Sequence, residues 1–147
     1  MDFRMKKILL KNARLVNEGR VTEGDLLIEG DRIGRIGSDL SDRNAGVIDL
    51  EGNYLLPGLI DDQVHFRQPG LTHKGDIASE SRAAVAGGIT SFMEQPNTIP
   101  QTTTLEKLEE KHAMAARSAY ANYSFLLGGT NDNLEEIKRL DKNACSG

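Results

Sequence analysis

Residues 57 to 76, PGLIDDQVHFRQPGLTHKGD, contain the pattern on which the fold prediction rests. The run Leu59 to Val64 is predicted to be a buried strand, with His65 at its end. Because alternate side chains of a strand point to the same face, positions 63 and 65 should lie side by side. A strand of the form Asp-x-His-x-His would place two imidazoles there. In this chain Gln63 occupies the first of those positions and His65 the second.

Bulk composition excludes several classes of function. The chain has 147 residues, 38% of them hydrophobic, and a net charge of −4, which is typical of an ordinary soluble protein. The 18 Lys and Arg are scattered among 22 Asp and Glu, so we expect no nucleic-acid partner. The apolar runs are far shorter than the roughly 20 residues of a membrane-spanning helix, so we expect no membrane role. The single Cys145 cannot form an internal disulfide, which fits a cytoplasmic location.

The pattern before Pro57 differs from the pattern after it. Short β-type runs alternate with turn signals in this first part, at residues 7–10, 13–16, 25–29, 32–36, 47–50 and 54–56. The turn Glu29-Gly30-Asp31-Arg32 predicts a tight hairpin, since Gly30 can adopt the positive φ that such turns need. We therefore predict a small antiparallel β-sheet domain of the sandwich type over residues 1–57.

After Pro57 the sequence predicts strands that alternate with helices. The expected strands are 59–64, 89–93 and 122–127, and the expected helices are 77–86, 102–119 and 133–140. Asp76 is the predicted N-cap of the first helix, and Gly87-Gly88 its stop. Successive βα units favour a parallel sheet or barrel, so the fold class is mixed α/β.

The length of the second part bounds the size of that barrel. A complete eight-unit barrel takes about 250 residues, or roughly 31 per unit, whereas residues 58–147 provide 90. We therefore predict the first three βα units of a TIM-like (β/α)8 barrel, truncated after the third. The sheet edge after the third strand should lack its neighbour, which predicts poor stability or association, as in a homo-oligomer.

Three separated motifs resemble those of a known family. They are His65-Phe66-Arg67 with Pro69-Gly70, the segment Ala86-Gly87-Gly88-Ile89-Thr90, and Pro96-Asn97-Thr98. With the β-rich segment that precedes PGLID, they make the chain similar to dihydroorotases of the amidohydrolase superfamily. The resemblance is to the cytosolic, barrel-forming branch that shares features with allantoinases and hydantoinases. It covers essentially the whole chain and implies a metal-dependent hydrolase barrel.

The resemblance implies a zinc-dependent reaction in pyrimidine biosynthesis. Dihydroorotases interconvert dihydroorotate and carbamoyl aspartate, using water activated by one or two zinc ions. His65 would be a metal ligand and Gln63 would occupy the position of a second ligand. An amide oxygen is a weak neutral ligand for zinc compared with an imidazole nitrogen. We therefore expect zinc to be reduced or absent in this chain, or the other ligands to compensate, or this copy to be catalytically silent.

The resemblance also implies residues that bind the substrate. Arg67 would bind the substrate carboxylate bidentately, and Asn97 would approach it from the neighbouring loop. From the residues alone, Arg67 could be a solvated charge, Asn97 a turn residue and His65 a surface histidine. The family's bridging lysine, its two further histidines and its catalytic aspartate belong to later strands, so no catalytic residue is expected within this chain. Gln68 departs from the family, which more often has Glu before Pro-Gly.

These observations lead to one main prediction and two alternatives. The parent protein is predicted to be a dihydroorotase with a small-molecule substrate, and this chain alone is predicted to be inactive. The first alternative is a non-catalytic dihydroorotase-like subunit that supports a pyrimidine-pathway partner, for which Gln63 is the hint. The second is another cyclic amidohydrolase of the allantoinase or hydantoinase type, against which Arg67 and Asn97 together argue.

Overall fold

The computed structural model describes residues 7–147, which divide into two compact units with a boundary after Pro57. In the first unit, β1 (Lys7–Asn17) pairs antiparallel with β2 (Arg20–Glu29), which pairs antiparallel with β3 (Arg32–Gly37). The β2–β3 hairpin confirms the predicted turn, and Gly30 has a φ of 64°. β4 (Ala45–Asp49) and β5 (Tyr54–Leu55) complete the sheet of this unit.

The prediction of an antiparallel sheet is wrong for the last two strands. Both β4 and β5 run parallel to β1, so the sheet is mixed. The physical reason is topological: after β3 the chain returns to the opposite edge of the sheet and pairs there with β1 instead of forming another hairpin. The predicted runs 7–10 and 13–16 form one strand, β1, with a bulge between Leu10 and Ala13.

Residues 7–57 form one sheet, so the predicted sandwich is not observed among them. The register places Ile48, Leu10, Leu26 and Ile36 in one row across four strands. The two ends of this row are open to solvent, because Ile36 is 61% exposed and Ile48 is 49% exposed. This row of the sheet is therefore aliphatic, and no second sheet from residues 7–57 covers it.

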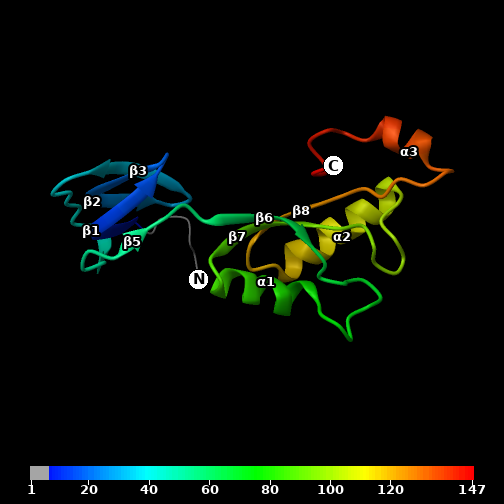
Figure 1. Ribbon diagram of the computed structural model, residues 1–147, viewed down its shortest axis with the longest axis horizontal. Helices are drawn as coiled ribbons and strands as arrows, with labels where there is room; N and C mark the ends of the chain where they lie inside the picture. Colours follow the sequence, from blue (N-terminus) through cyan, green and yellow to red (C-terminus); the bar gives the residue numbers. More distant parts are fainter. Residues whose placement is uncertain (1–6) are drawn as a thin grey trace. The chain divides into compact units, whose positions relative to one another are not determined.

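The second unit contains the three predicted βα units (Figure 1). β6 (Leu59–Val64), β7 (Ile89–Glu94) and β8 (Asn122–Phe125) form a parallel sheet in that order. The helices are α1 (Ile77–Ala86), α2 (Leu105–Ser118) and α3 (Leu134–Arg139). The mixed α/β fold class and the parallel sheet are thus confirmed, because each helix follows a strand as the sequence predicts.

Local capping explains why α1 and α2 begin where they do. The Asp76 carboxylate accepts a hydrogen bond from the Ser79 N–H at 2.7 Å, and the Ser79 side chain bonds back to the Asp76 backbone. Thr104 caps α2 by accepting a hydrogen bond from the Lys107 N–H. α1 ends at Gly87, whose N–H bonds back to the last turn. These contacts satisfy backbone groups that a helix end leaves without partners.

The core of the second unit lies between its sheet and the helices α1 and α2. It is formed by the buried side chains of Val64, Phe66, Ile77, Phe92, Leu108, Ala115 and Phe125. His112 of α2 packs edge-on against Phe125, with ring centroids 4.9 Å apart. The core therefore fixes the carboxyl ends of β6 and β7, where Val64 and Phe92 are anchored.

Of two expectations about the sheet edges, the one about β6 is wrong. β6 was predicted to be buried, but Leu59 is 54% and Ile60 is 64% exposed, because β6 is an edge strand with β7 as its neighbour. The edge of β8 was predicted to lack a neighbour, and no strand pairs with it beyond β7 among residues 7–147. At the end of β8, the Ser146 N–H donates to the Phe125 carbonyl at 2.9 Å, and the Leu127 N–H donates to the Gly147 carbonyl at 2.8 Å. The last residues of the chain thus partly cover that edge.

Candidate functional site

The predicted site residues lie in the two segments that follow β6 and β7. His65 and Arg67 follow β6, and Asn97 follows β7. Because neighbouring parallel strands end at the same edge of the sheet, these segments are brought together. The Gln95 N–H donates to the Val64 carbonyl at 3.0 Å, and the Ile99 N–H donates to the Pro69 carbonyl at 3.1 Å. We call residues 65–71 the first loop and residues 95–102 the second loop.

Close packing between the two loops explains the glycine of the Pro69-Gly70 motif. Gly70 has a φ of 81°, in the region that favours glycine. A Cβ at this position would overlap the Ile99 carbonyl oxygen of the second loop. A larger residue would therefore separate the loops as well as strain the backbone.

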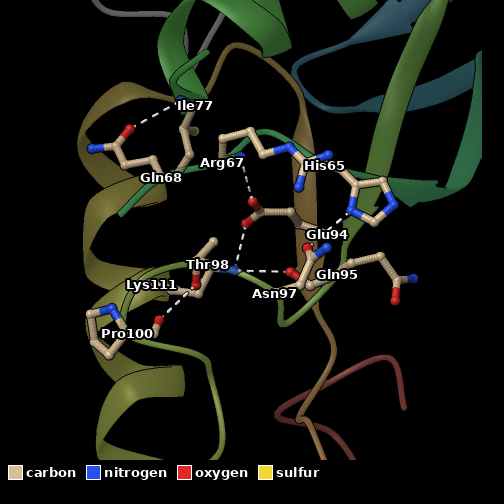
Figure 2. Close-up of polar contacts among 10 residues, drawn as sticks. All are labelled: His65, Arg67, Gln68, Ile77, Glu94, Gln95, Asn97, Thr98, Pro100 and Lys111. Atoms are coloured by element: carbon tan, nitrogen blue, oxygen red, sulfur yellow. Dashed lines mark hydrogen bonds and ion pairs between the residues drawn. The ribbon is translucent and has the colours of Figure 1, made fainter. Parts of the chain in front are cut away.

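His65 and Asn97 form a direct contact between the loops. His65 Nδ1 and Asn97 Oδ1 are 3.0 Å apart, and the two side chains face each other in Figure 2. In the tautomer that donates from Nδ1–H to this carbonyl oxygen, the Nε2 lone pair remains available. Metal-binding histidines commonly donate their other ring N–H to such an oxygen, which fixes the tautomer and the ring orientation. The contact therefore suits His65 to bind a metal through Nε2.

Gln63 lies on the same side of its segment as His65. Gln63 and His65 are exposed while Val64 and Phe66 are buried, so the alternation on which the prediction rests holds for these four residues. The Gln63 N–H donates to Asp61 Oδ1 at 3.1 Å. A metal role for either side chain stays a prediction.

The donor set within residues 7–147 is too small for a zinc centre. No group of three or more His, Cys, Asp or Glu side chains is close enough in this part of the chain to hold a metal ion. Catalytic zinc sites use three protein ligands and keep a fourth position for water. One imidazole and one amide oxygen do not meet that requirement, so no metal-dependent step can be assigned to these residues alone.

Arg67 is held through its backbone. It has a φ of 71°, and its N–H donates to Glu94 Oε1 at 3.1 Å (Figure 2). Its side chain belongs to a half-buried residue in the first loop, beyond the end of β6.

A buried ion pair beneath Arg67 was missed by sequence reasoning. Lys111 Nζ of α2 lies 2.7 Å from Glu94 Oε2, and both side chains are 1% exposed. This ammonium is the partner of Oε2. Burial raises the pKa of Glu94 against the opposing attraction of Lys111, and burial likewise lowers the pKa of Lys111 against Glu94.

A sequence signal for this ion pair did exist. Lys111 follows Leu108 by three positions and precedes Ala115 by four, so it lies on the apolar stripe of α2. Glu94 follows the buried Phe92 by two positions and so shares its side of β7. A charged residue at a core position of each element indicates a buried pair.

Two further contacts shape the loops. Gln68 Oε1 accepts a hydrogen bond from the Ile77 N–H at 3.0 Å, so the departure at position 68 still ties the first loop to the start of α1. The buried Thr98 hydroxyl donates to the Pro100 carbonyl at 2.9 Å within the second loop. Both contacts restrict the loops that carry Arg67 and Asn97.

Solved structures of hydantoinases share the fold of this chain. The L-hydantoinase (dihydropyrimidinase) from Arthrobacter aurescens matches with a TM-score of 0.86 at 35% identity, over 92% of this chain and 30% of that chain. A crystal structure of D-hydantoinase matches with a TM-score of 0.76 at 31% identity, over 90% of this chain and 30% of that chain. The class is therefore that of the cyclic amidohydrolases.

The particular family follows from the sequence match. The Dihydro-orotase-like family model matches residues 52–143, and the chain belongs to this family. A dihydroorotase of Pediococcus pentosaceus is 39% identical over 138 residues, covering 91% of this chain and 32% of the relative. The L-hydantoinase of Paenarthrobacter aurescens is 35% identical over 138 residues, covering 92% of this chain and 30% of that relative. The chain thus spans about a third of the length of these relatives. No helix among residues 7–147 is long and apolar enough to cross a membrane.

Proposed function

We propose that this chain provides the carboxylate-binding part of a dihydroorotase active site. The observation that carries the proposal is the placement of Arg67 in the first loop beside a second loop whose Asn97 is joined to His65. Dihydroorotate carries a ring carboxylate that dihydrouracil and hydantoin lack. A guanidinium fork matches the geometry of a carboxylate and binds it with two parallel hydrogen bonds.

Asn97 supports the proposed carboxylate site because the oxygen and the nitrogen of its side-chain amide can make different contacts. Its Oδ1 is 3.0 Å from His65 Nδ1, so its amide group is oriented by the first loop. The Nδ2 end is a donor of two hydrogen bonds and can add to the contacts that Arg67 makes with a carboxylate. The same side chain thereby links the proposed metal ligand to the proposed substrate carboxylate.

We propose zinc only for a protein that has further metal ligands in addition to those of this chain. When bound, zinc lowers the pKa of a coordinated water to about 7 and so supplies a nucleophile for opening the ring amide. We propose His65 as one ligand and Gln63 as the neighbouring position, with further donors outside this chain. Residues 1–147 alone are accordingly proposed to be inactive. We also propose a cytoplasmic location, and no partner other than the small-molecule substrate and copies of the same protein.

Two alternatives have an observation in their favour. Gln63 in place of an imidazole favours a non-catalytic dihydroorotase-like subunit that supports a pyrimidine-pathway partner. The TM-score of 0.86 to an L-hydantoinase favours a cyclic amidohydrolase of the hydantoinase type. The first alternative predicts no turnover in a complete protein. The second predicts turnover of rings without a carboxylate.

A chimaera tests all three functions. This chain would replace the matching third of the Pediococcus pentosaceus dihydroorotase, and hydrolysis of dihydroorotate, dihydrouracil and hydantoin would be measured alongside zinc content. The main proposal predicts zinc binding and selective turnover of dihydroorotate. Preference for hydantoin or dihydrouracil would contradict it in favour of the hydantoinase type. A folded chimaera without zinc or turnover that regains both with Gln63→His would support the non-catalytic alternative.

The same chimaera measures the role of Arg67. Arg67→Gln removes the cation while keeping a polar side chain, and kcat/KM for dihydroorotate should fall on the order of 100-fold, because a charged hydrogen-bonded contact contributes about 2 to 3 kcal/mol. Lys138→Gln is the matched control, since it removes one cation from an exposed pair with Glu135. An equal decrease of kcat/KM in both variants would show that Arg67 does not bind the substrate.

A further inference from the structure

The Glu94–Lys111 ion pair touches both loops of the candidate site. Glu94 Oε1 accepts from the Arg67 N–H at 3.1 Å, and Lys111 Nζ donates to the Gln95 carbonyl at 3.3 Å. Figure 2 shows this pair between the segment that carries Arg67 and the segment that carries Asn97. We propose that Glu94 and Lys111 are positioning residues, which hold Arg67 and Asn97 in the arrangement that binds a carboxylate. This inference rests on the proposed function.

The hydrogen bond from the Arg67 N–H to Glu94 stabilises an unfavourable backbone conformation at Arg67. Arg67 has a φ of 71°, and a left-handed conformation costs a residue with a side chain about 1 to 2 kcal/mol. A hydrogen bond from its N–H to a carboxylate is stronger than one to a neutral acceptor. Because Glu94 ends β7 and is packed in the core, it gives the first loop a fixed point of attachment.

The contact with Gln95 acts on the second loop. The Gln95 carbonyl accepts from Lys111, while the Gln95 N–H donates to the Val64 carbonyl at 3.0 Å. Both backbone groups of Gln95 are thus fixed two residues before Asn97. The ammonium that neutralises Glu94 is therefore also the group that holds the base of the second loop.

The chemistry of the pair favours a role beyond stability. Two charges taken out of water carry a large desolvation penalty, and apolar residues of similar volume often stabilise a protein as well or better. An apolar replacement at position 94, however, would leave the Arg67 N–H without its acceptor. What position 94 must supply is an oxygen directed at that N–H, and Lys111 allows this oxygen to be a buried carboxylate.

Two double variants of residues 1–147 separate positioning from stability. Glu94→Gln with Lys111→Met, the amide variant, removes both charges and keeps an oxygen acceptor at position 94. Glu94→Leu with Lys111→Met, the apolar variant, removes both charges and the acceptor. Both variants lose the Lys111 bond to Gln95, so their difference isolates the contact with Arg67. The measurements are hydrogen exchange of the Arg67 amide and the Kd for dihydroorotate by NMR titration, with dihydrouracil as the matched ligand without a carboxylate.

We expect the amide variant to retain the support of Arg67 that the apolar variant loses. Its Arg67 amide should stay protected, and its Kd for dihydroorotate should be lower than that of the apolar variant by a factor on the order of ten, the effect of one hydrogen bond of ordinary strength. The apolar variant should remain folded, as judged by the amides of β7 and β8, yet exchange the Arg67 amide rapidly. Equal protection and equal Kd in the two double variants would overturn the positioning role of Glu94.

Failure of the proposed function gives a different result. If the unsubstituted chain binds dihydroorotate no better than dihydrouracil, carboxylate binding is refuted, and with it the ligand-binding purpose of the pair. Selective loss of Arg67 protection in the apolar variant would then identify a purely structural restraint. Selective binding by the unsubstituted chain, with unchanged binding in both variants, would keep the function and reject the positioning.

Discussion

Two buried carboxylates, one in each unit, perform a related task by different means. Asp25 on β2 is 3% exposed and accepts hydrogen bonds from the N–H groups of Asn12 and Leu40, both at 2.9 Å. Glu94 on β7 is fully buried and accepts from the N–H of Arg67. Asn12 and Arg67 both have positive φ, 55° and 71°. Each carboxylate thus holds a left-handed residue in place.

The difference between them is the cation. Lys11 lies 3.6 Å from Asp25 and is 32% exposed, whereas Lys111 lies 2.7 Å from Glu94 and is 1% exposed. Burial acts to raise the pKa of Asp25, but its two backbone donors and Lys11 outweigh it and hold the pKa below the ordinary value. The pKa of Glu94 is raised, because burial prevails there. A carboxylate solvated by backbone donors keeps its charge, while one that depends on a buried lysine is sensitive to losing it.

Loss of Lys111 should produce the largest effect. Lys111→Met leaves Glu94 buried without its counter-ion, and breaking such a pair costs about 3 to 5 kcal/mol. The free energy of unfolding of the second unit, from urea titration followed by NMR of β7 and β8 amides, measures the loss. Lys138→Met, which breaks the exposed 2.7 Å pair with Glu135, should change it by less than about 1 kcal/mol. Similar losses in the two variants would show that burial does not distinguish these pairs.

Loss of the Asp25 carboxylate should have a smaller effect on the first unit. Asp25→Ala leaves the Asn12 and Leu40 N–H groups without their acceptor, and because both bonds are only part-buried, water can replace some of the loss, so the total cost should be about 1 to 3 kcal/mol. Urea titration followed by the amides of β1 and β2 reports this loss. Lys11→Met, which keeps the carboxylate and its backbone donors, is the control and should cost less. A larger effect of Lys11→Met would show that the cation, and not the backbone, supports Asp25.

Loss of an exposed carboxylate that accepts the same kind of hydrogen bond should cost less stability than loss of a buried one. Asp76 caps α1 by accepting from the Ser79 N–H at 2.7 Å in an exposed contact. Asp76→Ala should cost about 1 kcal/mol, because water can replace part of the lost bond, and Asp76→Asn should restore most of it. Thermal unfolding followed by circular dichroism measures both. A loss as large as that of Lys111→Met would contradict the ranking by burial.

The pH dependence of stability should have opposite signs for the two buried carboxylates. The folded-state pKa of Asp25 is lowered, so its stabilising contribution is present above the ordinary value of 3.8 and is lost as pH falls through the folded pKa. The folded-state pKa of Glu94 is raised, so the folded state binds more protons above the ordinary value of 4.5. Its contribution to stability therefore decreases as pH rises from 4.5 toward the folded pKa.

Asp25→Asn and Glu94→Gln make these signs measurable. Relative to Asp25→Asn, the unsubstituted chain should lose unfolding free energy as pH falls below 3.8. Relative to Glu94→Gln, it should lose unfolding free energy as pH rises above 4.5. Parallel pH profiles for the two comparisons would refute the assignment of opposite shifts.

Local sequence signals predicted the helices and strands better than the pairing of strands. The bounds of α1 were predicted because Asp76 and Gly87 carry the capping chemistry within a few residues of its ends. The parallel pairing of β4 with β1 was not, because it depends on which edge of the sheet the chain reaches after β3. Burial of β6 was overpredicted for the same reason, since its exposure depends on neighbours distant in sequence.

The candidate site was predictable as a set of residues and not as a set of contacts. His65, Arg67 and Asn97 follow strands whose order could be read from the chain, so their approach to one edge was expected. The bond between His65 and Asn97 and the support of Arg67 by Glu94 depend on side chains 32 and 27 positions apart. The stripe position of Lys111 and the position of Glu94 two residues after Phe92 were the sequence signals of that support.

The most direct test of carboxylate binding is an NMR titration of residues 1–147 with dihydroorotate and, in parallel, dihydrouracil. If Arg67 and Asn97 bind the carboxylate, dihydroorotate should cause saturable shifts at the Arg67 side-chain N–H groups and the Asn97 amide, and dihydrouracil much weaker ones. In Arg67→Gln the response of Asn97 to dihydroorotate should fall to the level seen with dihydrouracil. Equal responses to the two ligands, or an unchanged response after Arg67→Gln, would contradict carboxylate binding by these residues.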